Sequence, residues 1–298
     1  MKLQKLDRNK CPVVTLLDDA LLEKRLSEAL CRKKVCSEQW YREPEKWYSL
    51  TSFNNPYITI HSEFLLLEKN RVRLSEFAGK STLVFYGVGT GDTESLFVKW
   101  MLENSKHAEV IAVDATRTYI ERFAMISLNL ENMVAGSEVS FLGLHALFEG
   151  LKRDMLHPEN SKYKKRVHIC LGNTTGNFEQ GEIFGIFGRL AEKGEYLILG
   201  AHLSHDLEKT LRSYDTPLVS NFVFSSIKHK FSDKGIGDIE WKINKKENSI
   251  EAWLGDVNIF RSKKYTLDEI RALAKSSGFE FIEEYNDGNS AIVVLRKK

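Results

Sequence analysis

Short runs of apolar residues alternate with longer amphipathic segments between residues 80 and 200. The runs fall at Leu83–Tyr86, Val110–Val113, Val139–Leu144, Val167–Leu171 and Tyr196–Leu199. Apolar residues recur at helical spacing between them, at Thr93–Asn104, Thr118–Leu130 and Glu182–Leu190. A strand buried on both faces reads as a continuous apolar run, and strands that alternate with helices form a parallel sheet. The pattern predicts a doubly wound α/β core of five such units.

The spacing of apolar residues is different before and after this core. Residues 16–36 carry leucines at three- and four-residue spacing, which predicts a helix, and an aromatic-rich segment follows. After residue 205 the alternation weakens around a predicted hairpin formed by Asp238–Ile243 and Ile250–Leu254. A predicted helix, Leu267–Lys275, and two strands joined by the turn Asn286–Gly288 complete the pattern.

The first predicted strand leads into a glycine-rich turn, Gly87–Asp92 (GVGTGD). Glycine has no Cβ, so a ligand can approach its backbone, and it adopts positive φ without strain. The helix that follows offers free N–H groups and a partial positive charge. Asp114 ends the next strand, where a carboxylate can accept both hydroxyls of a bound ribose. We therefore expect Gly87, Gly89, Gly91 and Asp114 to bind a nucleoside cofactor.

The dinucleotide-binding pattern G-x-G-x-x-G is incomplete, because Asp92 stands at the position of its third glycine. A pyrophosphate therefore suits the turn less well than S-adenosylmethionine. Two other interpretations stay open. The fold could have lost its ligand site, and Asp114 could be a plain cap of the following helix.

The predicted fourth strand ends in Leu171–Phe178 (LGNTTGNF), which closely resembles the L-G-[SGN]-T-x-G-N-F signature of the histidine-specific N-alpha-methyltransferases. Shorter matches follow in the family's order at Trp40-Tyr41, Asn55–Tyr57, Ser62-Glu63, Leu197–Gly200, His205-Asp206, Ser213–Asp215 and Ser262–Thr266. The resemblance covers roughly residue 35 to the C-terminus. It implies that S-adenosylmethionine is the cofactor and that the methyl acceptor is the amine of an amino acid or a related small molecule.

The resemblance also implies the architecture. We expect a Rossmann-like class I methyltransferase core with a seven-stranded, mostly parallel sheet, together with a second, smaller α+β domain that binds substrate. The core would comprise residues 63–204 and 271–298, and the substrate-binding domain residues 1–62 and 205–270. The acceptor would lie between the two domains, as ligands often do.

Individual roles carry over residue by residue. Asn177 and Tyr214 are implied to hold the amino and carboxylate groups of the acceptor. Gly172 is implied to line the cofactor site, and we expect the neighbouring Asn173 to do the same. Three of these positions belong to the specific segment Leu171–Phe178, and Tyr214 belongs to Ser213–Asp215, which is similar to the family's A-Y-D.

Methyl transfer from a sulfonium is an in-line displacement that requires a neutral nitrogen aligned with the C–S bond. Tyr41 and Tyr57 are implied to close the site around the two reactants. Tyr41 and Asn177 are our candidate catalytic residues, although a dedicated base is optional if the amine binds in its neutral form. Ordinary aromatic packing is the alternative interpretation of Tyr41.

Two departures from the family pattern concern the ligands. The family has a glutamate two residues before the serine of its S-x-K-Y-T motif, whereas this chain has Phe260 before Ser262. A phenylalanine cannot pair with a buried imidazole but suits an aromatic or apolar side chain. We expect Phe260 and Ser262 to contact the acceptor, for which histidine is only one candidate. Leu144 and His145 replace the family's acid near the adenine, and His145 is better explained as a surface or core histidine.

Composition narrows the remaining possibilities. The formal net charge of +2 gives no support for a nucleic-acid-binding surface, and the basic run Ser161–Arg166 fits a solvated loop. No apolar run approaches the length of a membrane span, and the charged N-terminal residues lack a signal-peptide pattern. The chain has four cysteines, Cys11, Cys31, Cys36 and Cys170, and they are not spaced for metal binding. We therefore expect free thiols, a cytoplasmic location and no bound metal.

Two functions of other classes stay open. A cofactor-binding protein without turnover, acting as a regulator or partner subunit, would fit the altered acids. A methyltransferase of nucleic acid or protein would need an exposed basic groove at the mouth of the site, for which the sequence offers only Ser161–Arg166.

Overall fold

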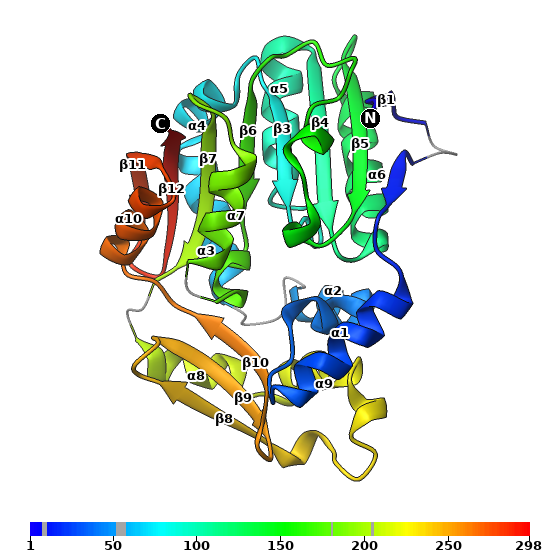
Figure 1. The fold of residues 1–298 in the computed structure, drawn as a ribbon. Helices are drawn as coiled ribbons and strands as arrows, with labels where there is room; N and C mark the ends of the chain where they lie inside the picture. The colour runs from blue at the N-terminus through cyan, green and yellow to red at the C-terminus, as the bar shows by residue number, and fades with distance from the viewer. Residues whose placement is uncertain (8–10, 52–57, 180, 204–205) are drawn as a thin grey trace.

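The computed structural model describes residues 1–7, 11–51, 58–179, 181–203 and 206–298, which form two sheets surrounded by helices (Figure 1). In this described part of the chain, the predicted core strands occur in the order β5-β4-β3-β6-β7-β12-β11. Their bounds are β3 Thr82–Tyr86, β4 His107–Asp114, β5 Glu138–His145, β6 Arg166–Cys170, β7 Tyr196–His202, β11 Phe279–Asn286 and β12 Ser290–Lys297. The strands β3 to β7 are parallel, and β12 is antiparallel to both its neighbours. The fold is the predicted class I methyltransferase fold.

Two short strands add to one edge of this large sheet. β1 (Gln4–Lys5) pairs antiparallel with β5, and β2 (Val13–Thr15) pairs parallel with it. Counted over the described residues, the sheet has nine strands and not the seven that we expected. Both added strands belong to the large sheet, although we had placed residues 1–62 with the substrate-binding part. Strands of two or three residues are too short for periodicity to reveal.

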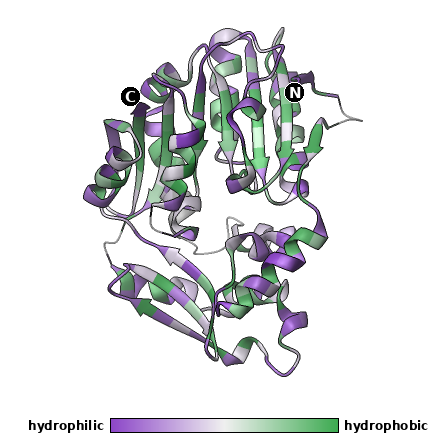
Figure 2. Ribbon diagram, viewed as in Figure 1, coloured by the Kyte–Doolittle hydropathy of each residue, from purple (hydrophilic) through white to green (hydrophobic). Residues whose placement is uncertain are grey.

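Helices cover both faces of the large sheet (Figure 1). One face carries α3 (Ile58–Lys69), α4 (Arg71–Ala78), α5 (Ser95–Ser105) and α6 (Arg117–Met133), and the other carries α7 (Glu182–Leu190), α10 (Leu267–Ser276) and the 3₁₀ turns η2 (Phe148–Gly150) and η3 (Arg153–Leu156). Alternate strand residues point to opposite faces, so Phe85 joins one apolar core and Tyr86 joins the other. The strands are therefore apolar along most of their length, as Figure 2 shows.

A smaller part lies beyond the carboxyl ends of the parallel strands (Figure 1). Its antiparallel sheet has the order β10-β9-β8, with β8 Ile239–Asn244, β9 Ser249–Leu254 and β10 Val257–Lys263. Its helical elements are α1 Asp19–Cys31, η1 Ser37–Arg42, α2 Pro44–Thr51, α8 Leu207–Tyr214, α9 Pro217–Ser225, η5 Lys228–Lys230 and η6 Ile236–Asp238. A separate apolar core unites residues 26–50 with residues 214–260. Two segments far apart in sequence thus build one structural unit.

The predicted hairpin is β8 and β9, to which β10 adds a third strand. The predicted helix at Glu182–Leu190 is α7, with the same bounds. Across the described residues, no helix is both long and apolar enough to span a lipid bilayer.

Candidate active site

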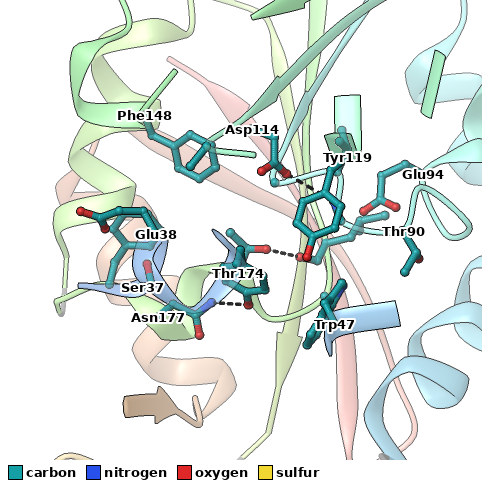
Figure 3. Close-up of a pocket in the computed structure, with 18 of the residues that line it drawn as sticks. Ser37, Glu38, Trp47, Thr90, Glu94, Asp114, Tyr119, Phe148, Thr174 and Asn177 are labelled. Carbon is teal, nitrogen blue, oxygen red and sulfur yellow. Dashed lines mark hydrogen bonds between the residues drawn. The ribbon is translucent and has the colours of Figure 1, made fainter. Parts of the chain in front are cut away.

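A cleft with about 940 Å³ of empty space opens at the carboxyl ends of β3, β4, β5 and β6 (Figure 3). The strand order reverses between β3 and β6, and open α/β sheets bind ligands at such a point. The turns after these strands form one wall, and η1 and α2 of the smaller part form the opposite wall. The cleft therefore lies between the two structural parts.

The glycine turn has the backbone that the sequence predicted. Gly87, Gly89 and Gly91 have φ values of +71°, +50° and +79°. Gly87 and Gly89 line the cleft. Gly91 lies behind the turn, where an added Cβ would approach a ring carbon of Phe123 to 2.9 Å. We infer that Gly91 lets α6, which carries Phe123, pack closely behind the turn. Gly87 and Gly89 face the ligand space.

Asp114 lies at the end of β4 and faces the cleft (Figure 3). Its Oδ1 accepts a hydrogen bond from the Thr116 N–H (2.8 Å), and its Oδ2 accepts one from the Gly89 N–H (3.3 Å). Burial raises the pKa of Asp114 to about 7. The N-cap residue of α6 is Thr116, so Asp114 links the glycine turn to the start of that helix and does not itself cap it.

Besides Glu38, which pairs with Arg25, two further buried carboxyl groups line the cleft, and the sequence analysis assigned neither to the site. Both oxygens of Glu63 accept from the Gly172 N–H, at 2.8 and 3.1 Å, and burial raises the pKa of Glu63 to about 7. Burial also raises the pKa of Glu94 well above its usual range, and the nearby Glu63, Asp92 and Asp114 add to this effect. A bound cation would favour the ionised form of each group. Glu63 belongs to Ser62-Glu63, one of the segments that match the family, and this match could have identified it as a site residue.

In the loop after β6, the adjacent residues Gly172 and Asn173 have different roles. Gly172 lines the cleft with a φ of +67°, and an added Cβ would meet no atom within 4 Å. The amide of Asn173, by contrast, is used within the protein. Its Nδ2 donates to Ser262 Oγ (3.3 Å) and to the Lys263 carbonyl (3.2 Å), and its Oδ1 accepts from the His202 N–H (2.9 Å). Asn173 thus ties the loop to β7 and β10.

A smaller cavity of about 340 Å³ adjoins the cleft. Its described lining carries no charged side chain and includes several aromatic ones: Tyr41, Trp47, Leu50, Gly172, Asn173, Asn177, Tyr214, Val219, Phe222, Phe260 and Ser262. Four of these residues also line the cleft: Tyr41, Trp47, Gly172 and Asn177. We call these four residues the junction, because they form the shared wall of the two spaces.

Tyr41 and Asn177 meet at the junction. The Asn177 Nδ2 donates to the Tyr41 hydroxyl (3.3 Å). The Tyr41 ring lies edge-on to Trp47 (5.3 Å between centroids) and Phe222 (5.4 Å). Burial raises the pKa of Tyr41, so its phenol stays protonated at neutral pH. The alternative packing role thus applies to this ring, and its contact with the reactants stays a prediction.

Phe260 and its neighbours form an aromatic wall of the smaller cavity. The ring of Phe260 lies 4.5 Å from Trp40, 5.6 Å from Tyr214 and 5.5 Å from Trp241, measured between centroids. The hydroxyl groups of Ser262 and Tyr214 lie 3.1 Å apart at the same cavity. The structure therefore brings together the substrate residues predicted from the sequence, with the exception of Tyr57, which lies outside the described residues.

The family has an acid near the adenine at the position where this chain has Leu144 and His145, at the end of β5. The His145 Nε2 lies 3.1 Å from the Ala115 carbonyl, and the cleft is lined instead by the following residues Ala146–Glu149. Among the residues described, no cluster of histidine, cysteine and carboxylate side chains could hold a metal ion.

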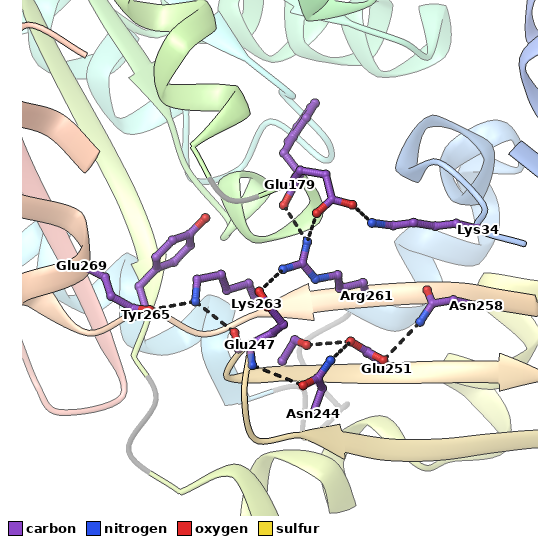
Figure 4. Close-up of polar contacts among 12 residues, drawn as sticks. Lys34, Glu179, Asn244, Glu247, Glu251, Asn258, Arg261, Lys263, Tyr265 and Glu269 are labelled. Atoms are coloured by element: carbon purple, nitrogen blue, oxygen red, sulfur yellow. Dashed lines mark hydrogen bonds and ion pairs between the residues drawn. The ribbon is translucent and has the colours of Figure 1, made fainter. Parts of the chain in front are cut away.

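A polar cluster fixes β10 to the loop that carries Asn177 (Figure 4). Arg261 Nη1 donates to the Phe178 carbonyl (3.2 Å) and to Glu179 Oε2 (3.1 Å), while its Nη2 reaches Glu247 (3.4 Å). Side chains alternate along the strand, so Phe260 and Ser262 face the cavity whereas Arg261 faces this cluster.

The fold and the site define a class I S-adenosylmethionine-dependent methyltransferase. A family model described as "histidine-specific methyltransferase, SAM-dependent" matches residues 44–230, which is more than half of the chain. The chain belongs to this family. Its activity is therefore S-adenosylmethionine-dependent N-methyl transfer.

Solved structures resemble this chain at low identity. Magnesium protoporphyrin IX methyltransferase from Synechocystis PCC 6803, with bound SAH, is 12% identical, with 88% of this chain and 97% of that chain covered and a TM-score of 0.49. A protein from Pyrococcus horikoshii OT3 is 16% identical, with 87% and 99% covered and a TM-score of 0.49. A methyltransferase from Clostridium acetobutylicum is 10% identical, with 94% and 99% covered and a TM-score of 0.44. The comparison with curated proteins found no match.

Proposed function

We propose that this enzyme methylates the amine of an amino acid or a closely related small molecule, and that it favours acceptors with an aromatic or apolar side chain. The observation that carries the proposal is the junction, where Tyr41, Trp47, Gly172 and Asn177 line both spaces. An acceptor in the smaller cavity reaches the cleft across this junction.

The described cleft residues suit S-adenosylmethionine, which supplies an electrophilic methyl group when bound. Gly87, Gly89 and Gly172 leave backbone accessible to the cofactor, and Asp114 would accept the ribose hydroxyls. The cofactor carries positive charge on its sulfonium and amino groups. Glu63 and Glu94, with Asp114, provide the carboxyl groups to compensate that charge.

Residues of the smaller cavity would hold the acceptor. Asn177 and Tyr214 would bind its polar groups, in agreement with the resemblance to the family. Phe260 and the rings around it would contact its side chain. A histidine imidazole needs a polar partner when it is buried, and an aromatic wall favours a ring without polar edges.

Tyr41 would orient the acceptor amine and would not deprotonate it. Its raised pKa keeps the hydroxyl protonated, and Asn177 fixes the position of that hydroxyl. The phenol can then donate to or accept from the nitrogen that enters the junction. An amine that arrives neutral needs no protein base, and the proton released afterwards can pass to water.

The test is methylation of a panel of acceptors with isotopically labelled S-adenosylmethionine, read by mass spectrometry. The panel holds L-histidine, L-tryptophan, L-tyrosine, L-phenylalanine and L-leucine. We expect the highest kcat/KM with an aromatic acid, and a shift of preference towards histidine in a folded Phe260→Glu variant. Faster methylation of histidine than of every aromatic acid by the wild type would contradict the proposed preference. Tight cofactor binding without any methyl transfer would favour the non-catalytic alternative.

We further propose that residues up to 51 outside β1 and β2, with residues 205–270, act as the substrate-binding domain, because α3 lies on the large sheet. The shared core of residues 26–50 and 214–260 supports this division. We also propose a cytoplasmic location, which the unpaired thiols of all four cysteines support.

A further inference from the structure

The described lining of the cleft has several carboxyl groups and no lysine, arginine or histidine. Its acids are Glu38, Glu63, Glu94, Asp114 and Glu149. Arg25 lies outside this lining and pairs with two of them, because its Nε donates to Glu38 (2.7 Å) and its Nη2 to Glu149 (3.1 Å). In the described part of the chain, the other three acids form no ion pair.

These three carboxyl groups differ in how the protein supports them. Glu63 accepts from the loop after β6, and Asp114 accepts from the glycine turn and from the start of α6. Glu94 precedes α5 and is only 8% exposed, yet its carboxyl group forms no hydrogen bond to another described residue. A buried carboxyl group without a partner is costly. Its place on the cleft wall therefore indicates that a bound ligand supplies the partner (Figure 3).

Glu94 belongs to the end of the cleft that adjoins the junction. The nearby Glu63 contributes to the raised pKa of Glu94, and Glu63 also holds the N–H of the junction residue Gly172. Transfer to an acceptor in the smaller cavity requires the methyl group at the junction. The sulfonium that carries this methyl group would therefore lie on the side of Glu63 and Glu94.

We propose that Glu94 makes the cleft selective for the charge of the cofactor, so that S-adenosylmethionine binds more tightly than its product S-adenosylhomocysteine. This inference rests on the proposed function, in which the cleft holds the cofactor. In the reaction, the electron pair of the C–S bond stays on sulfur and the sulfonium becomes a neutral thioether. The acceptor nitrogen gains the methyl group, and its proton passes to water. Methyl transfer thereby removes the charge that Glu94 attracts, and the product competes poorly with the next S-adenosylmethionine.

The positive charge is the main difference between the two ligands, which share their adenosine and amino-acid parts. The glycine turn and Asp114 therefore contribute similarly to the binding of both. A bound cation favours the ionised form of Glu94, and Coulomb interactions are strong in a poorly solvated site. With the neutral thioether, the raised pKa of Glu94 favours the protonated carboxyl group, and this attraction is absent.

The test is calorimetric binding of S-adenosylmethionine, S-adenosylhomocysteine and sinefungin to the whole chain without an acceptor. Sinefungin has a carbon in place of the sulfur and an ammonium group in place of the methyl group, so it keeps the positive charge. The wild type should bind the two cationic ligands at least tenfold more tightly than S-adenosylhomocysteine. Glu94→Gln removes the charge and should weaken both cationic ligands at least tenfold. It should change the Kd of S-adenosylhomocysteine by less than about threefold.

Glu103→Gln is the matched control. Glu103 lies on α5, the helix that begins after Glu94, but it is exposed and pairs with Arg71. Removal of its charge should leave the Kd of all three ligands within about twofold of the wild type, because water screens exposed charges. Thermal unfolding shows whether each variant is folded.

Two outcomes overturn the proposal. One is a wild type that binds S-adenosylhomocysteine as tightly as S-adenosylmethionine. The other is a folded Glu94→Gln variant with an unchanged ratio of these two Kd values, which shows that Glu94 does not discriminate between the ligands.

Asp114→Ala separates a failure of this inference from a failure of the proposed function. If Asp114→Ala weakens S-adenosylmethionine binding while Glu94→Gln leaves the ratio unchanged, the cleft holds the cofactor and only this inference fails. If neither substitution alters the binding of any of the three ligands, the cleft is not the cofactor site, and the proposed function fails with the inference.

Discussion

Asp114 is a buried side chain that both holds the local fold and lines the cleft. Its two oxygens hold backbone N–H groups of the glycine turn and of the start of α6. The same carboxylate faces the cleft, where its burial raises its pKa to about 7. The ribose of a bound cofactor would share these oxygens. Asp114→Ala is therefore expected to weaken S-adenosylmethionine binding by about 1–3 kcal/mol.

The raised pKa of Asp114 predicts a pH-dependent stability without cofactor. The folded protein holds this proton more tightly than the unfolded chain, whose Asp pKa is about 3.8. The stability contributed is complete below about pH 3.8 and is lost as the pH rises through about 7. Asp114→Asn removes this loss, so its free energy of unfolding relative to wild type should rise by about 3 kcal/mol from pH 4 to pH 7. Urea unfolding at a series of pH values measures it, and a pH-independent difference would refute it.

Gly200 depends on its small size because Glu63 occupies the space beside it. An added Cβ would overlap Glu63 Oε2 and would lie 2.8 Å from Glu63 Cδ. Gly200→Ala should displace the carboxylate that holds the Gly172 N–H, destabilise the protein by about 1–3 kcal/mol and weaken cofactor binding. Gly185→Ala is the matched control, because no atom lies within 4 Å of its added Cβ. Equal thermal stability and cofactor affinity in the two variants would contradict this account.

At the scale of elements, long periodic segments were predictable and short or polar ones were not. α7 has the predicted bounds because its apolar residues follow one helical face. β10 escaped prediction because several of its side chains are polar and are satisfied only in the folded structure. Arg261, for example, is buried yet bonded to Glu179 and Glu247, which lie on other segments.

Some residues of the site were likewise predictable from local sequence, and others were not. The glycine turn, Asp114 and Asn177 carry signals in local sequence. The burial of Glu63 and Glu94 arises only when separate elements meet at the cleft, and the pairing of Lys264 with Tyr214 joins residues 50 positions apart. Such long-range contacts leave no periodic or motif signal in one sequence.

The polar cluster around Arg261 is expected to hold the loop of Asn177 in place. Arg261→Met removes the donors to the part-buried Phe178 carbonyl and to the carboxylates of Glu179 and Glu247. We expect a loss of about 1–3 kcal/mol in stability and a larger drop in kcat/KM for the acceptor than in cofactor affinity. Lys33→Met is the control, since its ion pair with Asp256 is exposed and should contribute little. A cofactor affinity that falls as far as kcat/KM would argue against this local role.

At the scale of the whole molecule, two structural parts meet around two adjoining spaces. The large sheet supplies the cleft, and residues 26–50 with 214–260 supply much of the smaller cavity. The junction belongs to both parts, because Tyr41 and Trp47 come from the smaller part whereas Gly172 and Asn177 follow β6. Substrate selection and cofactor binding can therefore be altered separately by substitutions on either side.

The central claim is that methyl transfer to an amine occurs at the junction. The most direct measurement is single-turnover transfer from labelled S-adenosylmethionine to an aromatic amino acid, with mass spectrometry to locate the methyl group. The account predicts label on the α-amine with the wild type, and at least a tenfold slower transfer with Asn177→Ala at unchanged cofactor affinity. Label elsewhere on the acceptor, or full activity in Asn177→Ala, would contradict it.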